Sequence, residues 1–184
     1  MSIVNHEKVL EFWFDPQTIP MHFTDDHYFD EIIRERFLET WELACEGLLV
    51  EWRATIQGRL AEIIVLDQFS RNLWRENENA YNQDRMAVIL AQEGVNHPDY
   101  NKLTQKEKKF LIMPFMHSES LALHDWALKY FQELGLDDTL RFENLHRELL
   151  EKFCRYPYRN NVLGRESTPE ELKALEISKY GFYS

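Results

Sequence analysis

The stretch "DHYFDEIIRERFLETWELACEG", residues 26–47, decides the fold class. Its apolar side chains recur at steps of three and four residues, namely Phe29, Ile33, Phe37, Trp41 and Ala44. This spacing places them on one face of an α-helix, and Gly47 suits the left-handed position just past a helix end. Helical spacing continues through most of the chain, and no stretch alternates as a half-buried strand would. The sequence therefore predicts an all-α protein.

We expect a single domain over residues 1–184, built from roughly eight helices whose short loops make neighbours antiparallel. Pro114 is expected to break or sharply kink one helix, because proline lacks the N–H that the helix interior needs. Helix starts are expected to be capped by Asn5, Thr104, Ser118 and Thr168, and helix ends to be followed by Gly94 and Gly135. The expected helices cover residues 5–14, 26–46, 59–69, 82–92, 104–114, 118–134, 138–153 and 168–176.

Composition narrows the class of protein further. Hydrophobic residues make up 44% of the 184, and only six glycines and six prolines occur, so the chain should fold rather than stay disordered. The net charge of −11 repels phosphate backbones and anionic lipid, so we expect neither nucleic acid nor membrane as a partner. The start resembles no secretory signal, which predicts a cytoplasmic protein. Cys45 and Cys154 lie on apolar helical patterns and are expected to be buried and unpaired.

The first polar group is "LDQFSRNLWR", residues 66–75, which ends an apolar run. Asp67 and Arg71 are four residues apart on one helix, where they can pair, and Gln68 and Asn72 lie beside them. One reading is that these side chains join the helix end to neighbouring backbone carbonyls. The other is that Gln68, Arg71 and Asn72 bind a ligand.

The second polar group is "PFMHSES", residues 114–120. A helix start favours an anion, although Ser118 and Glu119 can also serve only as cap and dipole complement. His117 can move a proton or be a satisfied donor, while His146 further on is expected at the rim of a helix. No metal site is expected, since His117 and Glu119 are two residues apart and do not share a helix face. No cofactor motif occurs.

The third polar group is "RYPYRNNVLGRES", residues 155–167, which contains Arg155, Arg159, Asn160 and Arg165. Guanidinium groups match carboxylate and phosphate with two parallel hydrogen bonds, so this loop could hold a small anion. The alternative is a tether that docks the last helix through acidic neighbours such as Glu148 and Glu151. Both readings stay open at this point.

Five blocks in order resemble a bacterial family, the domain of unknown function 924: "VLEFWF", "FDEIIRERF", "LAEIIVLDQFSRN", "FLIMPFMHSES" and "RYPYRNNVLGRESTPEE". The resemblance runs from about Lys8 to Phe182. It implies an all-α fold of the tetratricopeptide-like superfamily, made of helical hairpins, and no settled biochemical role. The chain has Ser70 where the family commonly has proline, and Tyr158 where histidine is common. A role that needs histidine beside Arg159 therefore does not carry over.

Three hypotheses about function follow. The leading one is a helical binding module whose pocket uses Arg71, Arg159 and His117 to bind a carboxylate or phosphate of a small molecule or peptide. The second is an enzyme of unassigned class, with His117 as general acid or base and Glu119 orienting it. The third is a scaffold whose buried polar network is purely structural. The oligomeric state and the identity of the ligand stay open.

Overall fold

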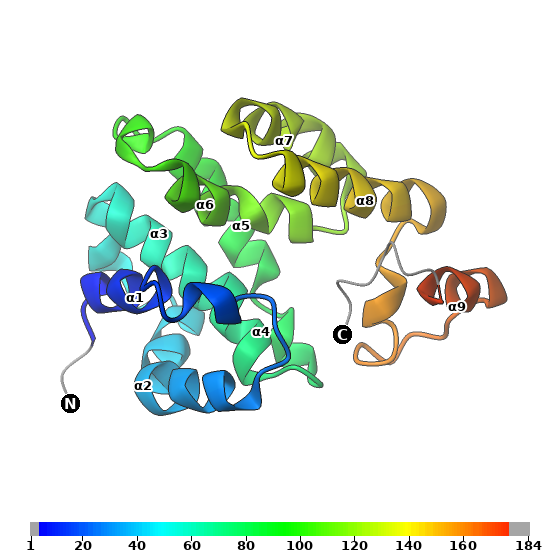
Figure 1. Cartoon of the computed structure of the whole chain (residues 1–184), viewed down its shortest axis with the longest axis horizontal. Coiled ribbons are helices and arrows are strands. Elements are labelled where there is room, and N and C mark those ends of the chain that lie inside the picture. The colour runs from blue at the N-terminus through cyan, green and yellow to red at the C-terminus, as the bar shows by residue number, and fades with distance from the viewer. Residues whose placement is uncertain (1–3, 177–184) are drawn as a thin grey trace.

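The computed structural model describes residues 4–176, so the predicted domain limits at 1 and 184 and the resemblance limit at 182 lie outside the described residues. Every regular element within residues 4–176 is helical, which confirms the all-α prediction (Figure 1). The α-helices are α1 His6–Trp13, α2 His27–Cys45, α3 Ile56–Ile64, α4 Ser70–Leu73, α5 Asp84–Val95, α6 Gln105–His117, α7 Leu121–Leu134, α8 Asp137–Phe153 and α9 Pro169–Leu175.

Short single turns connect several of these helices. A π-helical turn, Val65–Phe69, joins α3 to α4 without a break, so the three segments form one continuous helix. Counted in this way, residues 4–176 contain the eight helices that the sequence predicts. The 3-10 turns are η1 Ile19–Met21, η2 Val50–Ala54, η4 Glu78–Ala80, η5 Tyr100–Lys102 and η6 Pro157–Arg159.

Side-chain caps begin several helices at the expected residues. The side chain of Asn5 accepts a hydrogen bond from the backbone of Lys8 at the start of α1. Thr104 and Thr168 each form a complete capping box with the glutamate three residues later. Because a cap depends on neighbouring residues only, these helix starts are readable from the sequence.

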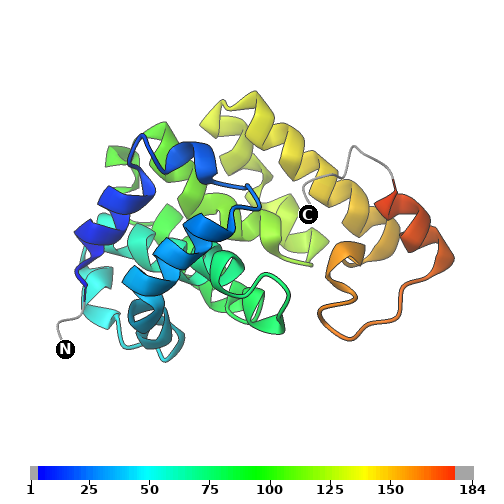
Figure 2. The same cartoon turned by 60° about the horizontal axis from the view of Figure 1, so that its bottom comes forward.

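The helices pack in chain order along the length of the molecule. α3 contacts α1, α5 and α6, α5 also contacts α6, and α7 and α8 follow as successive neighbours of α6. α7 and α8 are joined by Gly135 and Leu136 only and pack together, so they form an antiparallel hairpin. The two views agree that α9 lies at the opposite end of the molecule from α1 (Figures 1 and 2).

The buried apolar residues form two groups of very different size. The main core takes side chains from α1 through α7. The second group lies between α8 and α9, and its buried members among residues 4–176 are Leu149, Leu150, Tyr156 and Ala174. α9 therefore has little apolar surface to hold it, and its polar contacts matter more than those of the other helices.

Of the two outcomes expected at Pro114, a break or a sharp kink, the break is wrong. α6 continues through Pro114 to His117, and Ser118 follows as its C-cap, while Ser120 caps α7. Every residue from Phe110 to Met116 is buried. Packing of that segment outweighs the loss of one helical hydrogen bond at proline. His117 is consequently the last residue of a helix and does not lie beside a helix start.

Two further boundaries differ from prediction. The helix expected at 59–69 begins at Ile56, where Thr55 caps it. Gly94 lies inside α5, which ends at Val95. A Cβ atom on Gly94 would lie 3.1 Å from the Leu111 side chain, so this glycine lets α5 and α6 approach closely. The glycine at position 94 is therefore explained by the close packing of α5 on α6, and not by a turn at the end of the helix.

Cys154 is exposed, contrary to expectation, whereas Cys45 is partly buried, and both thiols are free. Cys154 forms the C-cap of α8 with φ of 57°, in the left-handed region that favours glycine.

We expect Cys154→Gly to raise the free energy of unfolding by about 0.5–1 kcal/mol in urea denaturation, because it removes this strain. Cys154→Ala keeps a Cβ at positive φ, so an equal gain in that control would contradict the explanation.

Candidate functional site

The π turn sets the positions of the first polar group. It inserts a wider turn into the helix that runs from α3 to α4, and such turns often occur at functional sites. Asp67 and Gln68 lie in this turn and are buried, and Arg71 lies one turn later in α4. The Arg71 Nη1 atom donates to the backbone carbonyl of Asp67 at 2.7 Å and lies 3.3 Å from its Oδ1 atom.

Arg71 and Arg159, from segments far apart in the sequence, meet at one carboxylate. Asp84, the first residue of α5, accepts from Nη1 and Nη2 of Arg71 at 2.9 and 3.1 Å. Its Oδ2 atom also accepts from Nη1 of Arg159 at 3.1 Å. Nη2 of Arg159 donates to the backbone oxygen of His117 at 2.9 Å. The two arginines therefore converge, as the predicted pocket requires, but the carboxylate of Asp84 lies between them where the sequence analysis placed an anionic ligand.

His117 joins this group through Asp67. Its Nδ1 atom lies 2.6 Å from Asp67 Oδ1. An ionised carboxylate can only accept, so Nδ1 carries the hydrogen, and Nε2 of the neutral ring is left as an acceptor. Burial and the charge of Arg71 lower the pKa of His117, although Asp67 acts in the opposite direction. The ring is therefore neutral near pH 7.

We call these five residues the arginine–aspartate cluster: Asp67, Arg71, Asp84, His117 and Arg159. Burial alone would raise the pKa of Asp67, but in acid the charges of His117 and Arg71, with hydrogen bonds from His117 and Gln68, outweigh it and lower that pKa to about 2. Near pH 7 the cluster holds two guanidinium cations and two carboxylate anions around a neutral imidazole. The cluster is electrically balanced.

Three tyrosine rings line the cluster on the side of Arg159. The guanidinium carbon of Arg159 lies 4.4, 4.8 and 5.7 Å from the ring centres of Tyr81, Tyr156 and Tyr158. Burial raises the pKa of Tyr158 to about 12, so its phenol stays neutral. Arg159 is 4% exposed, and its Nε–H group is buried without an acceptor among the described residues. A buried donor of this kind is costly when nothing accepts from it.

Arg71 and His117 are the most exposed members of the cluster, with side chains that are 22% and 13% exposed. His146 approaches from α8, with its ring centre 6.4 Å from that of His117. The His146 side chain is buried, whereas the sequence analysis expected it at the rim of a helix. Burial holds the pKa of His146 well below its ordinary value. Among the described residues, no group of three or more histidine, cysteine or acidic side chains could hold a metal ion.

Two other predicted ligand residues lie at different distances from the cluster. Gln68 is adjacent, since its Nε2 atom donates to Asp67 Oδ2 at 2.5 Å and contacts the sulfur of Met113. Asn72 points elsewhere and donates to Asp30 of α2 at 2.8 Å, next to Arg75. The structure therefore separates Asn72 from Arg71, although the two are neighbours in sequence.

The remaining predicted residues form a separate network, which we call the C-terminal tether: Arg155, Arg165, Asn160, Glu119 and Glu171. Arg155 donates to both carboxylate oxygens of Glu171 at 2.6 and 2.8 Å. Asn160 donates to Glu171 and to Ser167. This arrangement matches the tether reading, but its acidic partners are Glu171 and Glu119, and not the expected Glu148 and Glu151.

Glu119 belongs to the tether and does not orient His117. It accepts from Arg165 at 2.8 and 2.9 Å and from the backbone N–H of Tyr156 at 2.7 Å. The carboxylate that orients His117 is Asp67. Because α6 continues to His117, the chain turns after it and carries Glu119 toward the loop of residues 155–167.

Asp84 and the three tyrosines were missed by sequence reasoning. An aspartate at a helix start is expected simply to complement the helix dipole, so Asp84 carries no local sign of a second role. Tyr156 and Tyr158 flank Pro157 within the quoted arginine block, and this mixture of aromatic and arginine residues is the signal that could have found them.

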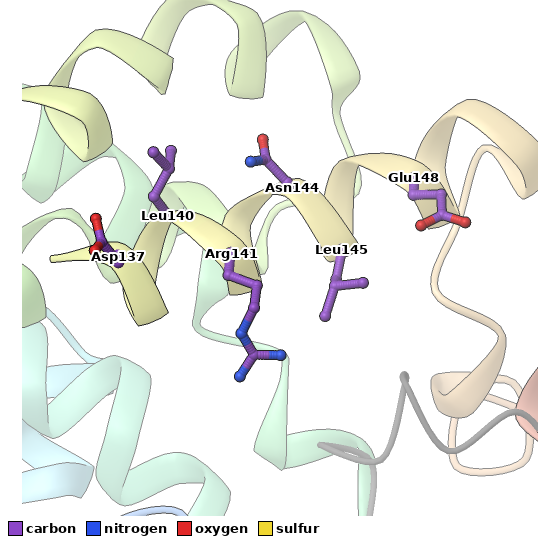
Figure 3. A pocket seen from close by; sticks show the side chains of 6 residues that line it. All are labelled: Asp137, Leu140, Arg141, Asn144, Leu145 and Glu148. Carbon is purple, nitrogen blue, oxygen red and sulfur yellow. The ribbon is translucent and has the colours of Figure 1, made fainter.

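The two described pockets lie away from the cluster. One is a hollow of about 330 Å³ on α8, where Arg141 and Leu145 point to the same side of the helix (Figure 3). The second, of about 320 Å³, is lined mainly by α2. The α8 pocket is lined by Asp137, Leu140, Arg141, Asn144, Leu145 and Glu148.

The fold and the cluster define an all-α protein with a charged, balanced group of side chains inside it. The chain belongs to a family of bacterial proteins of unknown function, DUF924, whose model matches residues 9–178. This confirms the resemblance seen in the sequence, while the tetratricopeptide-like assignment stays a prediction.

The chain is also similar to a solved structure of a protein of unknown function, ATU0120, from Agrobacterium tumefaciens. The two are 31% identical with a TM-score of 0.86, over 93% of this chain and 96% of that one. No protein with a curated description matches the chain. Within residues 4–176, no helix has the length and apolar character needed to span a bilayer.

Proposed function

We propose that the protein binds a small anion, a carboxylate or phosphate of a small molecule or peptide, at the arginine–aspartate cluster. The observation that carries this proposal is the meeting of two guanidinium groups from distant segments at Asp84, where the buried Nε–H of Arg159 has no acceptor among the described residues. Arg71 and Arg159 already share Asp84, so the ligand adds an acceptor to guanidinium groups that are held in place. Such preorganised groups bind at a low entropic cost.

The test is a thermal-shift titration with sulfate, phosphate and acetate. We expect at least one of these anions to raise the melting temperature of the wild type, because a ligand that binds only the folded state stabilises it. Arg159→Lys should weaken that binding about tenfold or more, since lysine keeps the charge but loses the planar fork. Melting of the unliganded variant reports separately whether Arg159 is needed for folding.

Arg165→Lys is the matched control. Arg165 lies in the same loop but pairs with Glu119 in the C-terminal tether. The control should bind the anion as the wild type does. If no anion shifts the wild type, or if both lysine variants weaken binding equally, the proposal fails and the scaffold hypothesis accounts for the cluster.

A second candidate function is favoured by the short contact between His117 and Asp67. The carboxylate holds the ring in one tautomer, as in enzymes that use histidine as a general base, and Nε2 is then the basic atom. We therefore also propose an enzyme in which His117 accepts a proton and Asp67, in place of Glu119, orients it. Screening hydrolase and phosphatase substrates tests this reading, and His117→Asn should abolish any turnover found.

A further inference from the structure

The charge balance of the arginine–aspartate cluster bears on how an anion can enter it. With His117 neutral, the two guanidinium groups are matched by Asp67 and Asp84. A bound anion would leave one negative charge without a partner in a largely buried place, which is costly. A balanced complex needs one more positive charge.

His117 is the group best placed to supply that charge. Its Nδ1–H is engaged with Asp67, and its Nε2 atom has no hydrogen-bond partner among the described residues. The charged and titratable groups around it are Asp67 in the π turn, Arg71 in α4, Asp84 in α5, His146 in α8 and Arg159 in η6. Of these, only His146 could compete for a proton near neutral pH, and it is more deeply buried than His117.

We propose that the cluster binds its anion together with one proton, which His117 takes up on Nε2. This inference rests on the proposed function and adds its regulation by pH. The imidazolium then donates from Nδ1 to Asp67 and from Nε2 toward the ligand, and the complex carries three positive and three negative charges for a monovalent ligand. For a divalent ligand such as sulfate, the same proton lowers the unmatched negative charge of the complex from two to one. The ligand raises the proton affinity of His117, and the proton raises the affinity for the ligand by the same factor.

The experiment is calorimetric titration of the wild type with sodium sulfate, which stays fully ionised between pH 6 and 8. At pH 7.5 the binding enthalpy, measured in buffers of different ionisation enthalpy, should report the uptake of nearly one proton. The affinity should rise as the pH falls from 8, approaching about tenfold per pH unit, and level off below the pKa of the free His117. Proton NMR of the His117 ring should show a higher pKa with sulfate than without it.

Two variants locate the proton. His117→Asn retains an N–H donor for Asp67 but does not titrate, so sulfate should bind more weakly, without proton uptake and with no rise in affinity as the pH falls. His146→Asn should keep the uptake of the wild type. Uptake lost in His146→Asn and retained in His117→Asn would overturn the assignment to His117.

The outcomes also separate this inference from the proposed function. If no tested anion binds to the wild type, the proposed function fails and this inference fails with it. If sulfate binds without proton uptake, only the present inference fails. Wild-type calorimetry and NMR decide the question even if a histidine variant does not fold.

Discussion

Asp84→Ala is expected to lose about 3–5 kcal/mol of unfolding free energy, because it leaves two guanidinium groups inside the protein without their shared carboxylate. Arg159 loses its only acidic hydrogen-bond partner among the described residues, and Arg71 loses two charge-assisted hydrogen bonds. The surrounding tyrosines contribute ring faces, which cannot replace an anion at that position. Urea denaturation measures the change as a lower midpoint.

The matched control is Glu11→Ala, which removes one charge of the same sign from a surface pair. Lys8 and Glu11 are 59% and 63% exposed, so this variant should stay within about 0.5–1 kcal/mol of the wild type. Sodium acetate supplies a free carboxylate and should restore part of the stability of Asp84→Ala more than it stabilises the wild type. A loss below about 1 kcal/mol in Asp84→Ala would show that the arginines do not depend on this carboxylate.

The parts of the fold that follow from neighbouring residues were predictable from the sequence. Asn5, Thr104 and Thr168 cap their helices as expected, and Gly135 ends α7 in the left-handed conformation. Each of these features depends on residues within one turn. These three helix starts, the all-α class and the number of helices could therefore be predicted from the sequence.

Features decided by packing could not be predicted in this way. Proline at position 114 favours a break, but burial of α6 on several sides maintains the helix. The π turn at Val65–Phe69 has no sequence signature, although it determines where Asp67 and Gln68 lie. Tertiary contacts override local preference at both places.

The candidate site was predictable in its cations and in Asp67, but not in Asp84. Arg71 was identified because it lies among apolar residues four positions after Asp67, and Arg159 because it is one of three arginines close together in an acidic chain. Their convergence on Asp84 depends on distances between segments, which one sequence does not contain. The same limit explains why Glu119, two residues from His117, was expected to orient it, whereas Asp67 does so from another helix.

Glu171→Ala is expected to release α9 locally, at a cost of about 2–3 kcal/mol. The Glu171 carboxylate accepts from Arg155, from Asn160 and from the backbone N–H of Thr168, so it both joins the tether and caps the helix. The apolar group beneath α9 is small and offers little compensation. Hydrogen exchange should show protection in α9 falling about thirtyfold for each 2 kcal/mol, while α1 to α6 keep theirs.

Acid should produce the same local release in the wild type. Hydrogen bonds from Arg155 lower the pKa of Glu171 from 4.5 to about 2, despite its burial. The carboxylate therefore stabilises the fold fully above about pH 4.5 and progressively less as the pH falls toward 2. The loss is about 2 kcal/mol, since Arg155 is partly in solvent, where screening weakens the pair.

Glu170→Ala, which removes an exposed neighbouring acid, should keep both the protection of α9 and its acid dependence. Equal protection of α9 in the two alanine variants would show that the tether does not hold this helix.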